Sequence, residues 1–319
     1  MDIKVTKKGS SISLAEATAL AISRRPGYLV REFDISLIVY GLYNDKSFGS
    51  KRINVRKHSP ETSDINRVIS ELLAREVIEK SSKIPFKSLY LKPNQGEISA
   101  QEVACFVDPL GYLSYLSAME WHGLTDRRAK VIQLTSARGT TWTNNINDLS
   151  LKILSESPIG ISGYQDEFGS VYMPGQIGWR KFEKNIAGQQ VVRHESADWN
   201  TDFFTEYDNG IRVSDVGYTF LDMIKKPDRC GGIYHVLEVF EEHGKRHRNS
   251  ILKVVNAIGN KIDKARIGYI MEEVVGIDGS PTLEKWVKTA VQRGGSRKLD
   301  ADNEYKNVYS ERWCISINI

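Results

Sequence analysis

The sequence has no long apolar run and nothing that would direct it to a membrane. None of its 319 residues falls in an apolar stretch that approaches the roughly 20 residues a membrane-spanning helix needs. The beginning of the chain, MDIKVTKKGSS, also lacks the apolar core of a secretory signal. We therefore expect a cytoplasmic protein with no membrane partner.

Cysteine is scarce, and the patterns of common catalytic sites are missing. Cys105, Cys230 and Cys314 lie far apart in the chain, which fits neither a disulfide framework nor a CxxC metal site. The sequence contains no phosphate-binding P-loop, no dinucleotide fingerprint and no GxSxG motif. His243 and His247 are four residues apart, but the polar segment around them is typical of a solvated helix end. The sequence therefore predicts no catalytic residue, no metal and no cofactor.

Positive charge is concentrated near the N-terminus. Residues 1–95 contain 17 Lys and Arg against 10 Asp and Glu, so the rest of the chain is mildly acidic although the whole carries +4. A basic part joined to an acidic one is typical of a nucleic-acid reader linked to a module with another partner. The turn-rich stretch 92–96 predicts the boundary between a domain of residues 1–95 and a second domain of residues 96–319.

Residues 59–91 have the pattern of a helix followed by a basic β-hairpin, which is typical of a winged helix. Ser59 can cap the helix, and Pro60 suits its first position. One apolar stripe follows at helical spacing, formed by Ile65, Val68, Ile69, Leu72, Leu73 and Val77. After Ile78 the lysines alternate with apolar residues, so we expect a wing whose lysines flank a DNA duplex.

The opposite face of this helix carries the side-chain types that reach phosphates and base edges in a major groove. These residues are Thr62, Ser63, Asn66, Arg67 and Ser70. Cations on both sides would neutralise the DNA backbone, and they are Arg52 and Arg56 on a preceding short strand and Lys80, Lys83 and Lys87 on the wing. Any surface helix shows a polar face, so a merely solvated face is the competing interpretation.

Two further helices are expected before this unit. The first begins with a capping box at Ser13 and ends at Arg24-Arg25-Pro26-Gly27, and the second follows Phe33-Asp34 and ends near Asn44. Three tyrosines in this basic part could stack on bases, but aromatic residues at helical spacing more often belong to a core. We expect Tyr28, Tyr40 and Tyr43 to be core residues.

The remainder predicts a larger mixed domain. Helices are expected from Ser99 to about Phe106 and from 111 or 112 to 122, and a strand over 130–135. The segment 140–210 reads as a small sheet with long loops, including strands at LSLKILS and GQQVVRH. Beyond a strand at 210–214, helical patterns follow, one of them capped by Asp215. The predicted fold class is α+β: an N-terminal winged helix-turn-helix followed by a larger mixed α+β domain that ends in a helical array.

Three segments together resemble a known family. They are YLSYLSAMEWHGLTDR, RVSDVGYTFLDMIKKPDRCGGI, and Lys298-Leu299-Asp300 followed by Arg312-Trp313. In this order behind a winged helix they are similar to the AbiE-type antitoxins, which pair with a nucleotidyltransferase-fold toxin in type IV toxin-antitoxin and abortive-infection systems. The resemblance spans most of the chain and is weakest over 140–210. The insert KSFGSKRINVRKHS departs from the more compact N-terminal domain of that family.

The resemblance implies a transcriptional repressor of its own operon that binds inverted-repeat DNA. Inverted-repeat sites would suit two copies bound with two-fold symmetry, although the sequence does not fix the oligomeric state. The resemblance also implies a C-terminal domain that counteracts the cognate toxin, and no catalytic centre. One alternative is a stand-alone winged-helix regulator whose C-terminal domain senses a ligand or oligomerises. A third reading, a nucleic-acid-modifying enzyme, would require a cluster of carboxylates or histidines with shifted pKa values in a cleft of the second domain.

Overall fold

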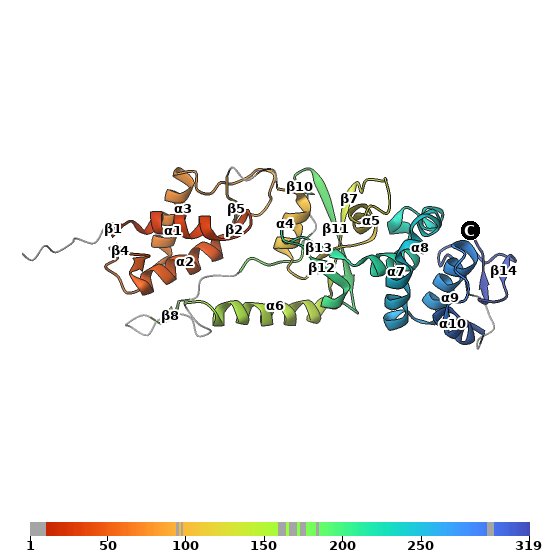
Figure 1. Ribbon diagram of the computed structural model, residues 1–319. Coiled ribbons are helices and arrows are strands. Elements are labelled where there is room, and N and C mark those ends of the chain that lie inside the picture. The colour runs from red at the N-terminus through yellow and green to blue at the C-terminus, as the bar shows by residue number, and fades with distance from the viewer. Residues whose placement is uncertain are drawn as a thin grey trace, which may run out of the picture. The chain divides into compact units, whose positions relative to one another are not determined.

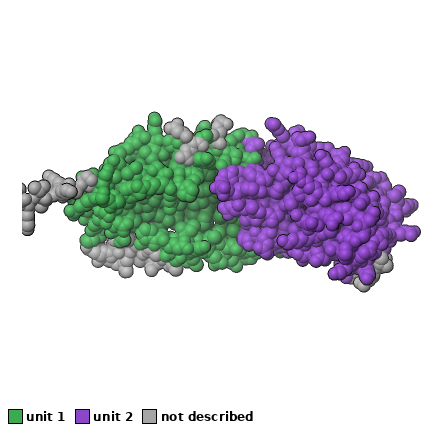
Figure 2. All heavy atoms as spheres, in the orientation of Figure 1, with its two compact units in different colours: residues 1–110, 138–188 green, residues 111–137, 189–319 purple. Residues whose placement is uncertain are grey.

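The computed structural model has a mixed α+β fold (Figure 1). It describes residues 11–93, 96, 98–158, 164–165, 171–172, 177–182, 185–291 and 297–319. The chain forms two compact units, and each takes two separate stretches of sequence (Figure 2). Unit 1 comprises residues 1–110 and 138–188, and unit 2 comprises residues 111–137 and 189–319. The predicted domain boundary, by contrast, divides the chain once, at residue 95.

Unit 1 begins with three helices, α1 (Leu14–Arg24), α2 (Glu32–Asp45) and α3 (Thr62–Ala74). Ser13 caps α1 as predicted, because its hydroxyl accepts the Glu16 N–H at 3.1 Å. The predicted cap of α3 is wrong: the N-cap is Glu61 and not Ser59. The Asp64 carboxylate accepts the Glu61 N–H at 3.1 Å and closes a capping box there, which fixes a later start.

Short strands connect these helices. β2 (Leu29–Arg31) lies between α1 and α2 and pairs antiparallel with β5 (Leu89–Leu91). Glu79 forms an antiparallel bridge with Leu91 on the other side of β5. The hairpin predicted after α3 is thus reduced to one bridge and one strand, because Ile84 and Phe86 turn into the core. A second small sheet has the order β1 (Ser11–Ile12), β4 (Lys51–Ile53), β3 (Ser47–Phe48).

The core of unit 1 gathers apolar side chains from all three helices, including Ile22, Phe33, Tyr40, Val68 and Leu72. Tyr40 and Tyr43 are buried as expected, whereas Tyr28 is 39% exposed, so that part of the prediction is wrong. Strand β2 places Tyr28 just before its first residue, outside the helical spacing that suggested a core position.

The later part of unit 1 contains α4 (Ala100–Val107), capped by Ser99 as predicted. It also contains α6 (Gly139–Ser155), where the sequence suggested a strand at LSLKILS. The prediction failed because a short apolar run fits a buried strand and a helix equally well. Short strands among the described residues of this part are β8 (Tyr164–Gln165), β9 (Val171–Tyr172) and β10 (Asn185–Ile186).

Five strands of unit 2 lie side by side in the order β11, β7, β6, β13, β12. Their bounds are β6 (Tyr112–Leu113), β7 (Val131–Ala137), β11 (Gln189–Ser196), β12 (Phe204–Glu206) and β13 (Arg212–Ser214). β11 runs parallel to β7, and β6 runs antiparallel to β7. Because Tyr112 and Leu113 join this sheet, helix α5 (Tyr115–Trp121) begins later than predicted.

The helical array expected at the C-terminal end is confirmed. It consists of α7 (Val216–Lys225), α8 (Ile233–Ile258), α9 (Lys261–Tyr269) and α10 (Pro281–Val291), with short turns at Thr201–Phe203 (η1), Pro227–Cys230 (η2) and Ile270–Val274 (η3). α8 continues through the polar segment around His243 and His247, which the sequence suggested was a helix end. Gly244 within it allows close packing, since a Cβ there would lie 3.1 Å from Val275. No helix in the described part of the chain is long and apolar enough to cross a membrane.

The chain ends in the hairpin of β14 (Tyr309–Ser310) and β15 (Ile315–Ser316). Between these strands Trp313 is fully buried in the core of unit 2, and its indole N–H donates to Glu272 at 2.8 Å. Arg312 forms ion pairs with Glu272 and Glu284 at 2.5 and 2.6 Å. Arg312 and Trp313 therefore hold the C-terminal hairpin against Glu272 of η3 and Glu284 of α10.

Candidate nucleic-acid interface

The outer face of α3 is the candidate site. All five residues expected on it are exposed, namely Thr62, Ser63, Asn66, Arg67 and Ser70. The Arg67 side chain is 62% exposed. The buried residues of the helix, among them Ile65, Val68 and Leu72, lie on its other face and join the core of unit 1. The structure thus brings these five polar residues together on one accessible surface.

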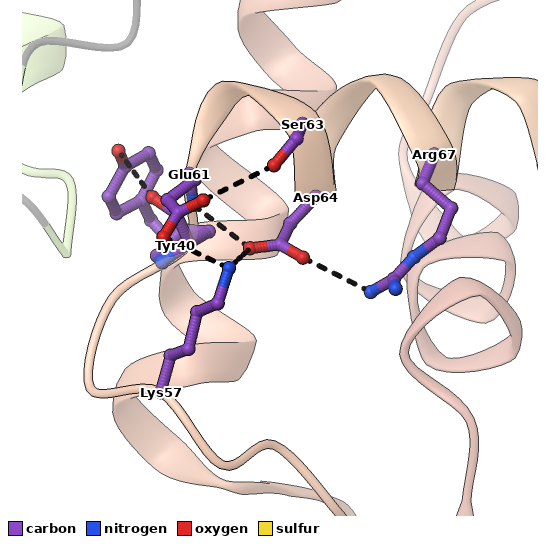
Figure 3. Close-up of polar contacts among 7 residues, drawn as sticks. Tyr40, Lys57, Glu61, Ser63, Asp64 and Arg67 are labelled. Atoms are coloured by element: carbon purple, nitrogen blue, oxygen red, sulfur yellow. Dashed lines mark hydrogen bonds and ion pairs between the residues drawn. The ribbon is translucent and has the colours of Figure 1, made fainter.

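An acidic side chain at the start of α3 organises this face (Figure 3). The Asp64 carboxylate accepts hydrogen bonds from Lys57 Nζ and from Arg67 Nη2, both at 3.2 Å, in addition to the Glu61 N–H. Lys57 also pairs with Glu61 at 3.0 Å. Partial burial alone would raise the pKa of Asp64, but the Glu61 N–H, Lys57 and Arg67 outweigh it and lower that pKa.

This network orients Arg67 and compensates part of its charge. Guanidinium groups held by a carboxylate lose less conformational freedom on binding, because one geometry is already favoured. Sequence reasoning missed Lys57, because it lies on the loop before α3, where ion-pair partners follow no helical periodicity.

The smaller side chains of the face differ in how they are engaged. Ser70 Oγ donates to the Asn66 carbonyl oxygen at 2.9 Å, one turn back along the helix. Ser63 Oγ lies 3.4 Å from a carboxylate oxygen of Glu61, to which it donates. Within the described ranges the Asn66 side chain makes no hydrogen bond, so its amide retains both donors and its acceptor for a ligand.

A groove of about 710 Å³ lies beside α3 in unit 1. Arg56, Lys57 and Arg67 line it together with Asn54, and Asp64 and Glu71 supply carboxylates. Arg56 is exposed and follows β4, whereas Arg52 lies within β4 and does not line the groove. Of the predicted backbone contacts before α3, the structure therefore brings Arg56 to the helix face.

The three predicted wing lysines, Lys80, Lys83 and Lys87, are exposed, but their segment is not a free hairpin. The Lys83 carbonyl accepts the Ala187 N–H at 2.9 Å. Phe86 packs edge to face on Phe182, with 5.3 Å between ring centroids. The segment thus contacts Phe182 and Ala187 of the same unit, a contact between distant parts of the sequence that no local pattern could indicate.

Unit 2 contains groups with strongly shifted pKa values. Burial raises the pKa of Asp222 to about 7, against the opposing effect of Lys225 and Arg229. Burial, assisted by Arg229, lowers the pKa of His194 to about 4. Tyr115, whose φ of 50° is unusual for a bulky residue, lies between them: its hydroxyl accepts a hydrogen bond from Arg229 at 3.1 Å, and its ring packs against His194.

A cluster of this kind is what the enzyme alternative expects, and the sequence had not revealed it. Such clusters also occur in structural cores, so the cluster does not by itself indicate catalysis. Across the residues that the structure describes, no group of three or more His, Cys, Asp and Glu could hold a metal ion.

Comparison with known proteins gives little. No family model and no curated protein matches the chain. Among solved structures, the crystal structure of the Rv2827c protein from Mycobacterium tuberculosis matches 95% of this chain and 90% of its own. The two are 11% identical with a TM-score of 0.49, a similarity too low to support a conclusion about function. The resemblance to AbiE-type antitoxins stays a prediction.

Proposed function

We propose that the N-terminal part of the chain is a winged helix that binds duplex DNA through α3. The order of the elements along the chain, α1, β2, α2, α3 and β5, supports this proposal, because it is the order of a winged helix-turn-helix. β5 also lies between β2 and Glu79, as the central strand of a small sheet. The observation that carries the proposal is the exposed polar face of α3, on which Asn66 and Arg67 are both accessible; Arg67 also lines the groove that contains Arg56 and Lys57.

In this proposal Thr62, Ser63, Asn66 and Arg67 reach base edges and phosphates, with Ser70 at the margin of the contact. A free amide suits bidentate contact with adenine, and a guanidinium suits guanine. Arg52, Arg56, Lys80, Lys83 and Lys87 neutralise the DNA backbone. Two copies would occupy the halves of an inverted repeat with two-fold symmetry.

For the protein as a whole we propose an antitoxin that represses its own operon and counteracts a nucleotidyltransferase-fold toxin, as part of phage defence in the cytoplasm. It would act without catalysis. The support for this part is the resemblance of the three segments named above. Its Arg312-Trp313 segment is structural in the present fold, so the toxin-directed residues must be sought elsewhere in the chain.

DNA binding is tested with the region upstream of the protein's own gene. Fluorescence anisotropy with this DNA and with a shuffled sequence should show preference for the natural sequence, and Asn66→Ala and Arg67→Ala should remove the preference. Arg75→Ala is the matched control, since Arg75 is an exposed arginine at the other end of α3, paired with Glu71. Equal affinity of the wild type for both DNAs would refute specific recognition.

The antitoxin part is tested by co-expression with the nucleotidyltransferase-like product of a neighbouring gene. A chain that begins near residue 97 is unsuitable, because it would remove most of residues 1–110 and leave residues 138–188 without the larger part of their unit. Full-length protein with Asn66→Ala and Arg67→Ala is better. Rescue of growth by this variant would separate toxin neutralisation from DNA binding, whereas no rescue by wild-type protein would refute the antitoxin role.

The second candidate function is a stand-alone regulator with a ligand-sensing second half. The observation that favours it is a groove of about 910 Å³ in unit 2, a size common for small-molecule sites. It predicts that wild-type protein does not protect against any neighbouring toxin, and that DNA binding changes when the groove is occupied.

A further inference from the structure

The second half of α8, in unit 2, carries positive charge without any acidic residue. Between Glu242 and Asp263 the chain contains five Lys and Arg and no Asp or Glu. Four of these cations lie on α8 and are exposed, and we call them the α8 cationic face: Lys245, Arg246, Arg248 and Lys253. The first half of the helix differs, since Glu238, Glu241 and Glu242 are exposed there. The cationic face is therefore confined to the second half.

Close packing on its other sides leaves this face open. Gly217 lets α7 lie close to α8, since a Cβ there would come within 2.4 Å of the Ser250 carbonyl oxygen. Gly244 in turn accommodates Val275, which would lie 3.1 Å from a Cβ at that position. Ile251 is fully buried and belongs to the core of unit 2. The cations occupy the remaining, accessible side of the helix.

The charges of this face are not compensated by neighbouring carboxylates. Glu241 lies four residues before Lys245, a spacing that favours an ion pair within a helix. None of the four cations nevertheless forms an ion pair with a residue that the structure describes. Arg248 Nε donates a hydrogen bond to the side-chain oxygen of Asn249 at 3.4 Å. A neutral amide therefore orients this guanidinium group and leaves its charge in place.

A histidine of the same helix responds to this positive charge. Burial is the largest cause that lowers the pKa of His247, and Arg246, His243 and His122 lower it further. His247 is therefore neutral at pH 7 and does not itself add charge to the face. The lowered pKa agrees with a positive potential around the middle of α8.

The positions of the cations along the helix place them on two flanks. Because successive residues turn by about 100° around a helix, Lys245 and Arg248 share one flank, and Arg246 and Lys253 share the other. Asn249 lies between the flanks. A helix with a cation row on each side suits the major groove of B-form DNA, which admits a helix and is bordered by the phosphates of both strands. The major groove of A-form RNA is too narrow for this arrangement.

The face lacks the residues that other anionic partners need. The chain has no Phe, Tyr or Trp from residue 241 to residue 268. Single-stranded nucleic acids are bound largely by stacking of bases on aromatic rings, and the binding energy of protein interfaces is concentrated in buried aromatic and arginine anchors. A single strand or an acidic protein is therefore a poorer occupant than a duplex.

We propose that the α8 cationic face binds the backbone of duplex DNA, with one flank directed at the phosphates of each strand. The contact is independent of sequence, because phosphates carry no sequence information directly. This second DNA-binding surface belongs to unit 2 and does not depend on DNA binding by α3.

The test measures binding of full-length protein to a fluorescent DNA duplex of shuffled sequence, by anisotropy at several salt concentrations. Lys245→Gln with Lys253→Gln removes one lysine from each flank. This variant should reduce the slope of log affinity against log salt by about two units, because each phosphate contact contributes about 0.9. Lys285→Gln with Lys288→Gln is the matched control, since it removes two exposed lysines from α10 of the same unit, and it should leave the slope unchanged.

Arg246→Gln with Arg248→Gln supplies a second pair, so the test does not depend on the folding of one variant, and it should reduce the slope equally. Duplex RNA of the same sequence and polyglutamate should bind more weakly than the DNA.

The proposal is overturned if wild-type protein does not bind the duplex, if the α10 pair lowers the slope as much as the α8 pairs, or if neither α8 pair changes it. Tighter binding of the RNA or of polyglutamate than of the DNA would also overturn it. Equal affinity of wild type for natural and shuffled DNA bears on α3 alone, because the slope on shuffled DNA still decides this proposal.

Discussion

Two helix-borne aspartates, one in each unit, have opposite surroundings. Asp64 in α3 is mostly buried, yet its carboxylate is satisfied by a backbone N–H, a lysine and an arginine, and its pKa is lowered. Asp222 in α7 makes no side-chain hydrogen bond or ion pair with the described residues, and its pKa is raised to about 7. Burial raises the pKa of both carboxyl groups, so the hydrogen-bonding and charged partners decide whether the net shift is upward or downward.

The contrast separates two kinds of polar site. Around Asp64 every charge already has a partner within the chain, so the network is complete and presents an oriented arginine to the outside. Around Asp222 no described residue forms a hydrogen bond or ion pair with the carboxylate, and the hydroxyl of the nearby Tyr218 is buried without a hydrogen-bond partner among the described residues.

The largest expected effect concerns pH-dependent stability at Asp222. Its folded-state pKa is raised above the unfolded value, so its ionisation disfavours the fold and stability falls as pH rises from about 4 through 7. Asp222→Asn should remove this loss and stabilise the protein at pH 8 by on the order of 3 kcal/mol, with little change at pH 4. Urea denaturation across this pH range measures it. A variant less stable than wild type at pH 8 would contradict the assignment.

The next effect concerns the arginine that Asp64 orients. Arg67→Ala should weaken binding to the specific DNA by about 1 to 3 kcal/mol and relax sequence preference, because a base-directed contact is lost. Anisotropy titrations with specific and shuffled DNA measure both quantities. A loss that is the same for both sequences would mean that Arg67 touches only phosphate.

Removal of the Asp64 charge comes third. Asp64→Asn weakens the cap of α3 and both ion pairs, so the free energy of unfolding should fall by about 1 to 2 kcal/mol at pH 7. Because the folded pKa of Asp64 is lowered, its contribution is present above the unfolded pKa and is lost as pH falls through the folded value. The difference between wild type and variant should therefore shrink below pH 4, opposite in sign to the result at Asp222. The prediction would be contradicted if the stability differences between wild type and each of the two variants changed with pH in the same way.

The smallest effect belongs to an exposed lysine. Lys83→Ala should weaken binding to all DNA sequences alike and reduce the slope of log affinity against log salt by about one unit, because one phosphate contact is lost. Titrations at several salt concentrations measure the slope. An unchanged slope would exclude Lys83 from the DNA contact and favour the structural role of its segment.

Local signals predicted the helices well where a cap and an apolar stripe coincide. Ser13 and Ser99 mark the starts of α1 and α4, and the stripe from Ile65 to Leu72 marks the buried face of α3. The prediction was wrong where one short apolar run fits two structures, as in α6, or where a strand joins a sheet from a distance, as at Tyr112. It also placed a helix end around His243 and His247, inside α8, because a polar stretch fits a helix end and the exposed part of a long helix equally well.

The candidate DNA-binding face could be predicted because the spacing of apolar residues in α3 distinguishes the buried face of the helix from the exposed one. Lys57, which pairs with Asp64, was missed because ion-pair partners on a loop follow no periodicity. Tyr218 could not be found either, since a tyrosine without a partner looks the same in sequence as one with a partner. Whether a polar atom is satisfied depends on the whole tertiary packing, and it can only be read from coordinates.

The alternation of the two units along the chain has a consequence for biosynthesis. The ribosome releases residues 1–110, then the first piece of unit 2, and only afterwards the stretch 138–188 that completes unit 1. The N-terminal helices therefore emerge before the last stretch of their own unit, because a segment of the other unit is synthesised in between. Domains usually fold in the order of their synthesis, and here unit 1 can close only once residue 188 has emerged, whereas unit 2 must hold its first piece, residues 111–137, until the rest of that unit follows.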